Sequence, residues 1–452
     1  MRAFTSSFAA LLFFACGNSA TSQPDATATP DSQNVDGATT DGPVGSPQRL
    51  AIEGRILKDA AGNVVRLHGV NLRDNLVGRS PSEERNPDNC LITCPPNDSA
   101  CKQTTGAIIT ATEADTLAST LSLNFVRLRI SFEGINRNDC DPDGTNLSPD
   151  LRRQLDEAVN LLAARQVWML IEMRTADTVA NEPGLYTPGQ PDFVAYQKAW
   201  TYLAKRYANV DYIAGYGLLA EPSPDKAFPA GEVVDKLTGF QHAMMDAVHA
   251  QDPKTPFFIG PAFNYDTMGY RWDAYKTAFP EYAGRIIYEV NLLTPKTWIK
   301  FGKNDDPANN PAAVDVAYPV TPAATPAQLT ETLLEPISNF TRPRDDERIF
   351  SKRSDLNFPM LMSKNYFAWY LGFAQAFAER HQVPMVVDQF GATSLAIERG
   401  QLQYEQDVID AAEAAGMGWC RWIYASGDDR DVFDDPRITN FYAARGAERA
   451  GP

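Results

Sequence analysis

G-Y-G-L-L-A-E-P-S-P, residues 215–224, joins a short apolar run to a carboxylate and two prolines. The run before Glu221 is typical of a strand that is buried on both faces, and Pro222 cannot continue a hydrogen-bonded ladder. We therefore expect a strand that ends by presenting the Glu221 carboxyl group. In a parallel barrel, a carboxyl group at such a strand end is a usual place for acid–base chemistry.

The composition fits one large globular domain and limits its partners. The chain has 452 residues, of which 44% are hydrophobic, and this suffices for a sizeable core. Its formal net charge is −16, so a nucleic acid or an anionic membrane surface would repel it overall. We expect no nucleic-acid partner and a monomeric protein that acts on a neutral or small substrate.

The N-terminus has the pattern of an export signal. Arg2 precedes the apolar run Phe8–Ala15, which is too short to span a bilayer permanently. L-L-F-F-A-C, residues 11–16, resembles a bacterial lipobox, in which a lipid on Cys16 would be the protein's membrane attachment. Residues 1–16 are thus a predicted lipoprotein signal, with a plain secretory signal or a mistranslated start as alternatives. Residues 17–48, rich in Ser, Thr, Asp, Ala and Pro, are predicted to be a disordered tether. These features indicate export to a bacterial cell envelope, in an outer-membrane-anchored or a secreted form.

Five further cysteines follow Cys16. Four of them lie in two loop-like stretches, and in an exported protein they suggest two disulfides with three possible connectivities. Zinc is the competing interpretation, but no histidine lies near them. Cys420, in an apolar run, is predicted to be a buried free thiol. The four loop cysteines are Cys90, Cys94, Cys101 and Cys140.

Apolar strands alternate with helical segments from residue 49 to residue 452. A hairpin, with strands at 51–57 and 64–67 and a turn at 59–63, leads into a first core strand that ends near Asn71. Seven more strands are predicted at 124–131, 167–174, 215–221, 256–263, 285–293, 384–391 and 418–424. Helices are predicted at 113–122, with Thr112 as the N-cap, and at 150–165, 192–207, 231–251, 271–279, 364–381, 405–415 and 437–450.

This alternation predicts the α/β class and a closed (β/α)8 barrel, with an N-terminal β-hairpin and a long insertion at about 294–363 after the sixth strand. An open doubly wound sheet is the alternative, but no glycine-rich phosphate loop follows any strand. The insertion contains aromatic residues that could wall a cleft or form their own cluster: Trp298, Phe301, Tyr318, Phe340, Phe350 and Phe358.

Polar residues two apart on a strand share a face, and three strands carry such pairs. They could line a cleft, or their charges could pair inside the barrel, Glu172 with Arg127 for example. The arginines also favour a substrate that carries a carboxylate or sulfate group. The pairs are Arg127 with Arg129, Glu172 with Arg174, and Glu289 with Asn291.

Six stretches in order carry a family resemblance: VVRLHGVNL (64–72), NFVRLRIS (124–131), LLAEP (218–222), VNLLTP (290–295), PMVVDQFG (384–391) and WCRWIY (419–424). Together they resemble the landmark strands of glycoside hydrolase family 5, the cellulase family of the clan A retaining glycosidases. The resemblance runs from about residue 50 to residue 452. It implies a TIM barrel that hydrolyses O-glycosyl bonds of β-linked oligo- or polysaccharides, without a cofactor or metal.

The resemblance also implies roles for single residues. Arg127 matches the second-strand arginine, Glu221 the acid/base glutamate, and Trp422 the aromatic platform under the reacting sugar. Other positions depart from the family pattern. Arg174 stands in place of a histidine and Ala220 in place of an asparagine, while Asn291 and Leu293 replace a histidine and a tyrosine.

The largest departure is at the nucleophile, a glutamate in the family, which falls on Gln389. A neutral amide is a poor nucleophile and cannot balance oxocarbenium charge. We therefore predict reduced or lost hydrolysis at a site where Glu221 and Gln389 occupy the catalytic positions and Arg127, Arg174, Asn291 and Trp422 bind the sugar.

Two alternatives remain open. One is an active enzyme with a relocated second carboxylate, from Asp388, Glu133 or Glu289; against Asp388, neighbouring residues on a strand face opposite sides. The other is a non-catalytic surface lipoprotein that binds carbohydrate or a protein partner.

Overall fold

A computed structural model describes residues 47–72, 108–132, 149–175, 177–271, 273–293, 299, 317–319, 363–425 and 431–449. The chain divides into two units, 1–45 and 46–452, and every described residue belongs to the second. The predicted signal, nearly all of the tether, the four loop cysteines, Glu133 and most of the insertion lie outside the described residues and stay predictions. No helix among the described residues has both the length and the apolar character needed to cross a bilayer.

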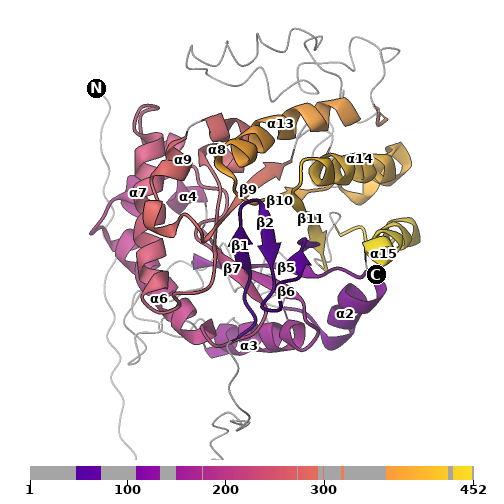
Figure 1. The fold of residues 1–452 in the computed structure, drawn as a ribbon, viewed down its shortest axis with the longest axis horizontal. Coiled ribbons are helices and arrows are strands. Elements are labelled where there is room, and N and C mark those ends of the chain that lie inside the picture. Colours follow the sequence, from indigo (N-terminus) through magenta and orange to yellow (C-terminus); the bar gives the residue numbers. More distant parts are fainter. Residues whose placement is uncertain are drawn as a thin grey trace, which may run out of the picture. The chain divides into compact units, whose positions relative to one another are not determined.

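Within these residues, eight parallel strands close into a barrel (Figure 1), and the predicted fold is confirmed. Each strand is paired with the next one along the chain, and β11 closes the ring onto β4. The strands are β4 (His68–Leu72), β5 (Phe125–Ser131), β6 (Trp168–Arg174), β7 (Ile213–Gly217), β8 (Phe257–Ile259), β9 (Ile286–Leu292), β10 (Met385–Phe390) and β11 (Gly418–Tyr424).

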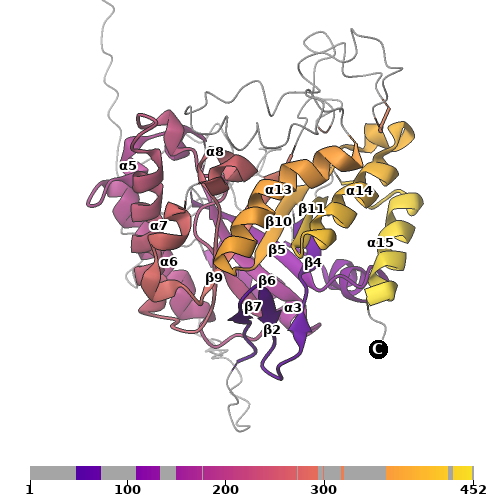
Figure 2. The ribbon, with the colours of Figure 1, turned by 45° about the horizontal axis from the view of Figure 1, so that its top comes forward.

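Helices surround the barrel and bury one apolar face each against it (Figure 2). In α6, for example, Phe193, Tyr196 and Trp200 recur at helical spacing and are buried. The long helices are α3 (Pro149–Ala163), α6 (Pro191–Tyr207), α7 (Val233–His249), α13 (Lys364–His381), α14 (Gln401–Ala414) and α15 (Pro436–Arg449). Short helices and 3-10 turns are α4 (Asp177–Ala180), α5 (Pro183–Tyr186), η3 (Pro224–Lys226), α8 (Ala262–Tyr265), η4 (Thr267–Arg271), α9 (Ala274–Thr277), η5 (Pro280–Tyr282) and η8 (Ser394–Arg399).

The N-terminal hairpin is a three-stranded sheet, which corrects the prediction of one strand at 51–57. That segment forms β1 (Ala51–Glu53) and β2 (Ile56–Lys58), because Gly54 takes a left-handed turn conformation with φ of +60°. The turn at 59–63 is confirmed, and β3 (Val64–Val65) pairs with β2 beyond it. Leu57 joins an apolar cluster with Leu50, Leu67 and residues from the amino ends of the strands. This cluster fills the amino-terminal end of the barrel interior.

The helix after the long loop begins earlier than predicted. Thr110, and not Thr112, is the N-cap of α2 (Ala111–Asp115), which continues as a π-helical turn, η1 (Thr116–Thr120). The Thr110 hydroxyl accepts from the Glu113 amide, and the Glu113 carboxylate accepts from the Thr110 amide. The T-x-x-E pattern from Thr110 to Glu113 is the signature of a capping box, and it could have predicted this helix start from the sequence.

Candidate active site

Glu221 does not lie on a strand, although the sequence pattern predicted it at a strand end. β7 ends at Gly217, and the next three residues run irregularly, with Leu218 and Ala220 still donating backbone hydrogen bonds to the neighbouring strands. Glu221 itself has a left-handed conformation, with φ of +51°. This costs a residue with a side chain about 1–2 kcal/mol. Such strain is concentrated at functional sites, where surrounding contacts hold it.

Asn291 and Asn264 hold the Glu221 loop in place. Asn291 Nδ2 donates to Glu221 Oε1 over 3.1 Å and to the Asn264 carbonyl over 2.9 Å. The backbone N–H of Asn264 in turn donates to the Pro222 carbonyl, and the side-chain oxygen of Asn264 accepts from Ser223 Oγ over 2.7 Å. Asn291 was predicted to bind sugar, and the structure gives it contact with Glu221. Asn264 was not found from the sequence, because nothing in its local pattern indicates a link between two loops.

Gln389 bridges Glu221 and Arg127. The ends of an amide are assigned from their partners, and here the nitrogen faces Glu221 while the oxygen faces Arg127. In this orientation Nε2 donates to Glu221 Oε1 over 3.1 Å, and the amide oxygen accepts from Arg127 Nη1 over 2.6 Å. Two carboxylates in these positions would repel each other at this distance. Both ends of the glutamine amide have a matching partner.

Arg127 is the centre of a buried polar network. Its Nη2 contacts both oxygens of Glu172, at 2.6 and 2.5 Å, and Asp388 Oδ2 at 3.0 Å. Nη1 also donates to Asn71 Oδ1 over 2.9 Å. The predicted alternative of a Glu172–Arg127 pair inside the barrel is confirmed. Because Arg127 is fully buried and bound to acids, it contributes no free charge for an anionic substrate.

Asp388 also faces Arg127, which corrects the prediction that it points away from the Gln389 side. Val387 pairs with Val290 and Gln389 pairs with Asn291, so Asp388 has no counterpart on β9. This extra residue is a β-bulge, which breaks the two-residue alternation of the strand. Two successive side chains of β10 therefore contact the same guanidinium group.

Glu172, Glu289 and Asp388 form a buried carboxyl cluster with ligand-type oxygens within 4.8 Å of one another. Burial raises the pKa of Asp388 to about 7, since the opposing effect of Arg127 is smaller and Glu172 and Glu221 repel its charge. Burial, with Glu172 and Asp388 nearby, also raises the pKa of Glu289 well above its usual range. Arg127 already binds two of the three groups, so protonation is the simplest way to neutralise the third.

Replacing Asp388 by asparagine should flatten the pH dependence of stability. The folded-state pKa of about 7 lies above that of the unfolded chain, so the contribution of Asp388 to the free energy of unfolding falls as pH rises from about 4 to about 7. Between pH 5 and pH 8, we expect the wild type to lose up to about 3 kcal/mol more than Asp388→Asn in urea unfolding. Glu157→Gln, on the exposed side of α3, should keep the wild-type slope. Equal slopes in wild type and Asp388→Asn would contradict the shifted pKa.

Trp422 completes the group of residues around Glu221. On β11, Arg421 binds Glu405 of α14 over 3.1 Å, so the next residue, Trp422, is directed into the barrel. There the Arg129 guanidinium lies 4.8 Å from the Trp422 ring centroid, and Arg129 Nη2 lies 3.6 Å from Glu221 Oε2. Thus Glu221, Gln389, Arg127, Asn291 and Trp422, all predicted from sequence, occupy one region.

Three other predicted residues take different places. Arg174 is the last residue of β6, partly exposed and opposite Ser131 of β5. Leu293 packs against the main hydrophobic core. Tyr318, suggested as a cleft wall, is buried and donates to Asp407 over 2.6 Å, so it belongs to the core around α14. Cys420 is buried and free, as predicted.

Comparison with known families identifies this barrel. The cellulase model (glycosyl hydrolase family 5) matches residues 94–294, which include β5 to β9. This part of the barrel is similar to glycosyl hydrolase family 5. The match contains Arg127, Glu221 and Asn291, and the family resemblance predicted from the strand motifs is confirmed. No curated protein sequence matches the chain.

Solved structures show the same fold as this barrel at low sequence identity. The cellulose synthase subunit Z of Clostridioides difficile is 14% identical, with a TM-score of 0.55, and the match covers 84% of this chain and 99% of that one. The endoglucanase Cel5A of Thermotoga maritima is 14% identical, with a TM-score of 0.54 and coverage of 83% and 96%. The β-glucanase SdGluc5_26A of Saccharophagus degradans is 12% identical, with a TM-score of 0.52 and coverage of 90% and 95%.

Proposed function

We propose that this family 5 barrel binds a β-linked glycan beside Glu221, Asn291 and Trp422, and that it has lost most of the retaining hydrolysis of its family. The proposal depends mainly on the Gln389 amide, which the family resemblance aligns with the nucleophile and which bridges Arg127 and Glu221. This bridge suits a glutamine, because one end of the amide donates and the other accepts.

Retaining hydrolysis needs two carboxyl groups, one to attack the anomeric carbon and one to protonate the leaving oxygen. The Gln389 side chain cannot perform the attack, because its nitrogen carries no free lone pair for nucleophilic chemistry. Glu221 Oε1 already accepts from two amide groups, of Asn291 and Gln389. A proton for a leaving group would therefore have to sit on Oε2, beside Arg129. Glu221 is thus well placed to accept hydrogen bonds from sugar hydroxyls.

Binding can be tested without turnover. Similar barrels have been crystallised with cellotetraose and with mannotriose, which makes these two oligosaccharides suitable probes. We expect at least one of them to raise the melting temperature, and Trp422→Ala to abolish the rise, because a sugar ring stacks on an indole face. Trp168→Phe is the matched control, because Trp168 lies in the apolar cluster at the amino-terminal end of the barrel interior. This variant should keep the rise in melting temperature. A rise that persists in Trp422→Ala would place the ligand elsewhere.

Turnover of an aryl β-glycoside tests the loss of hydrolysis. The wild type should show no more than background release of the aryl group. Measurable release that disappears in Glu221→Gln would overturn this part of the proposal, because it would show a working acid/base.

The bulge at Asp388 favours one second candidate, an active glycosidase with a relocated carboxylate. The bulge directs Asp388 to Arg127, on the same side as Gln389. Strand alternation therefore does not exclude Asp388 as the second carboxylate. Its carboxyl group is 1% exposed, however, and would have to reach the substrate past Gln389. If the wild type is active and Asp388→Asn is not, this second candidate is correct.

A further inference from the structure

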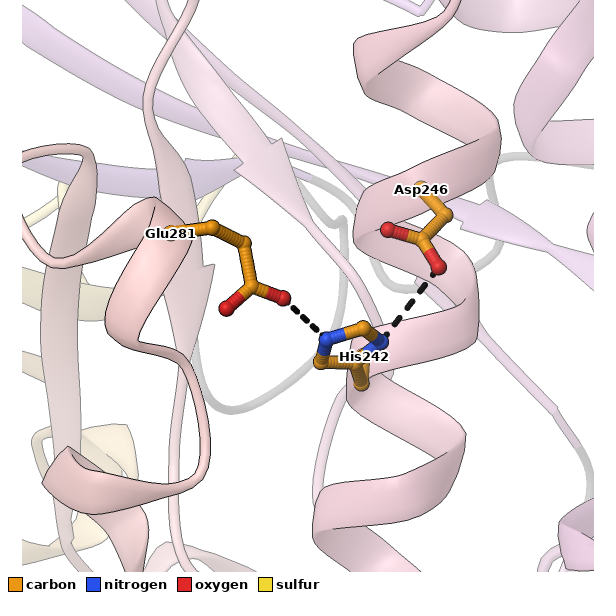
Figure 3. Close-up of side chains that lie close together, drawn as sticks. All are labelled: His242, Asp246 and Glu281. Atoms are coloured by element: carbon orange, nitrogen blue, oxygen red, sulfur yellow. Dashed lines mark hydrogen bonds and ion pairs between the residues drawn. The ribbon is translucent and has the colours of Figure 1, made fainter.

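His242, Asp246 and Glu281 form a cluster on the outer layer of the barrel, and none of them is among the residues described around Glu221 (Figure 3). His242 and Asp246 lie one turn apart on α7, and Glu281 comes from η5. His242 Nδ1 is 3.3 Å from Asp246 Oδ2, while Nε2 faces Glu281 Oε1. One ligand-type atom from each of the three residues lies within 4.8 Å of the other two.

Neighbouring aromatic residues fix the orientation of this cluster. The His242 ring stacks on Phe279, with centroids 6.3 Å apart and an interplanar angle of 23°. The Tyr282 ring meets it edge-on at 6.0 Å, and the Tyr282 hydroxyl donates to Asp246 Oδ1 over 2.5 Å. This outer hydrogen bond leaves Asp246 Oδ2 directed at the imidazole. Such outer partners are typical of sites whose ligands are held ready for a metal.

The other three histidines of the chain have different surroundings. His381 shares the Asp273 carboxylate with Arg380, and His249 faces Arg285. His68 stacks on Trp419, and its Nε2 lies 3.8 Å from Glu413 Oε1.

Within the described residues, the acids beside His242 have no ion pair with a lysine or arginine. Two carboxylates thus face one imidazole, in a chain whose net charge is −16. A bound cation would remove this local excess of negative charge.

We propose that His242, Asp246 and Glu281 bind a divalent transition metal of the zinc type. One imidazole nitrogen and two carboxylate oxygens are a donor set that zinc accepts, and a water molecule can complete the tetrahedron. Protons compete with the metal for imidazole and carboxylate ligands, so metal binding weakens as pH falls. It connects α7 to η5 and stabilises the outer layer of the barrel without a part in sugar binding.

The test measures zinc binding by calorimetry and the melting temperature of the full chain. For the wild type we expect a binding event of one zinc per chain and, at zinc about 100 times Kd, a rise on the order of 3 °C. The zinc affinity and the rise in melting temperature should both be larger at pH 7.5 than at pH 5.5. His242→Gln should lose at least about tenfold in affinity together with the temperature shift, and Glu281→Gln should weaken both.

His381→Gln is the matched control, since its histidine has one carboxylate and a competing arginine. It should bind zinc as the wild type does. Comparing variants also removes the contribution of any zinc bound elsewhere in the chain. Unchanged zinc affinity in His242→Gln, or no binding by the wild type at about 1 mM zinc, would overturn the proposal.

Discussion

Replacing Gln389 by glutamate should raise the turnover of an aryl β-glycoside at least about a thousandfold over the wild type. The new carboxylate would be held by Arg127 Nη1, as the amide oxygen is now. It would also lie opposite Glu221, close enough for the two acids to share a proton or to move apart. Retaining hydrolysis needs a pair of carboxyl groups, one as nucleophile and one to protonate the leaving oxygen, and the introduced carboxylate and Glu221 would form that pair in Gln389→Glu.

The measurement is kcat/KM from pH 4 to 9, where an acid and a base acting together should give a bell-shaped profile. Gln389→Met, similar in size and uncharged, is the control and should show no gain. If Gln389→Glu binds oligosaccharide but stays inactive, Gln389 alone does not explain the loss. Ala220, Asn291 and Arg174, which also depart from the family pattern, would then contribute to it.

Replacing Arg127 by glutamine should destabilise the fold by about 3–5 kcal/mol at pH 7.5, the cost of leaving buried acids without their counter-charge. Glu172 and Asp388 both bind this guanidinium, and all three side chains are 0–1% exposed. The loss should shrink towards pH 4, because protonation of Asp388, whose pKa burial raises to about 7, removes part of the unpaired charge. Urea unfolding at pH 7.5 and at pH 4 measures this loss in the free energy of unfolding.

Arg206→Gln is the matched control for this loss. Arg206 pairs with Asp156 on the surface, where the two side chains are 33% and 29% exposed, so its removal should cost no more than about 1 kcal/mol. Equal losses in the two variants, or a loss in Arg127→Gln that does not change with pH, would contradict the charge network inside the barrel.

Strong periodic patterns allowed much of the fold to be predicted from the sequence. The helix at 364–381 and the strand at 418–424 were placed correctly at both ends, because each is long and has clear boundaries. The errors lie where one residue changes the backbone locally. Gly54 breaks a predicted strand into two, and the irregular run before Glu221 replaces the end of β7.

Five residues of the site were predicted from the sequence, but most of the contacts that connect them were not. Strand parity left two alternatives for Glu172 and Arg127, lining a cleft or pairing inside the barrel, and the structure shows the pair. Parity failed at Asp388, because a bulge depends on how β10 pairs with its neighbours and leaves no mark in the strand's own sequence. The links through Asn264 and the bridging amide of Gln389 join loops and strands far apart in the chain. No local pattern encodes them.

The bulge in β10 also bears on how such a barrel can change during evolution. In an unbroken strand, moving a reactive group by one residue would turn it to the opposite surface. Here Asp388 and Gln389 both contact Arg127. A single substitution at either position can therefore change which of the two side chains carries a carboxylate at this guanidinium group. The scaffold can therefore lose, keep or reassign its chemistry while every other strand stays in register.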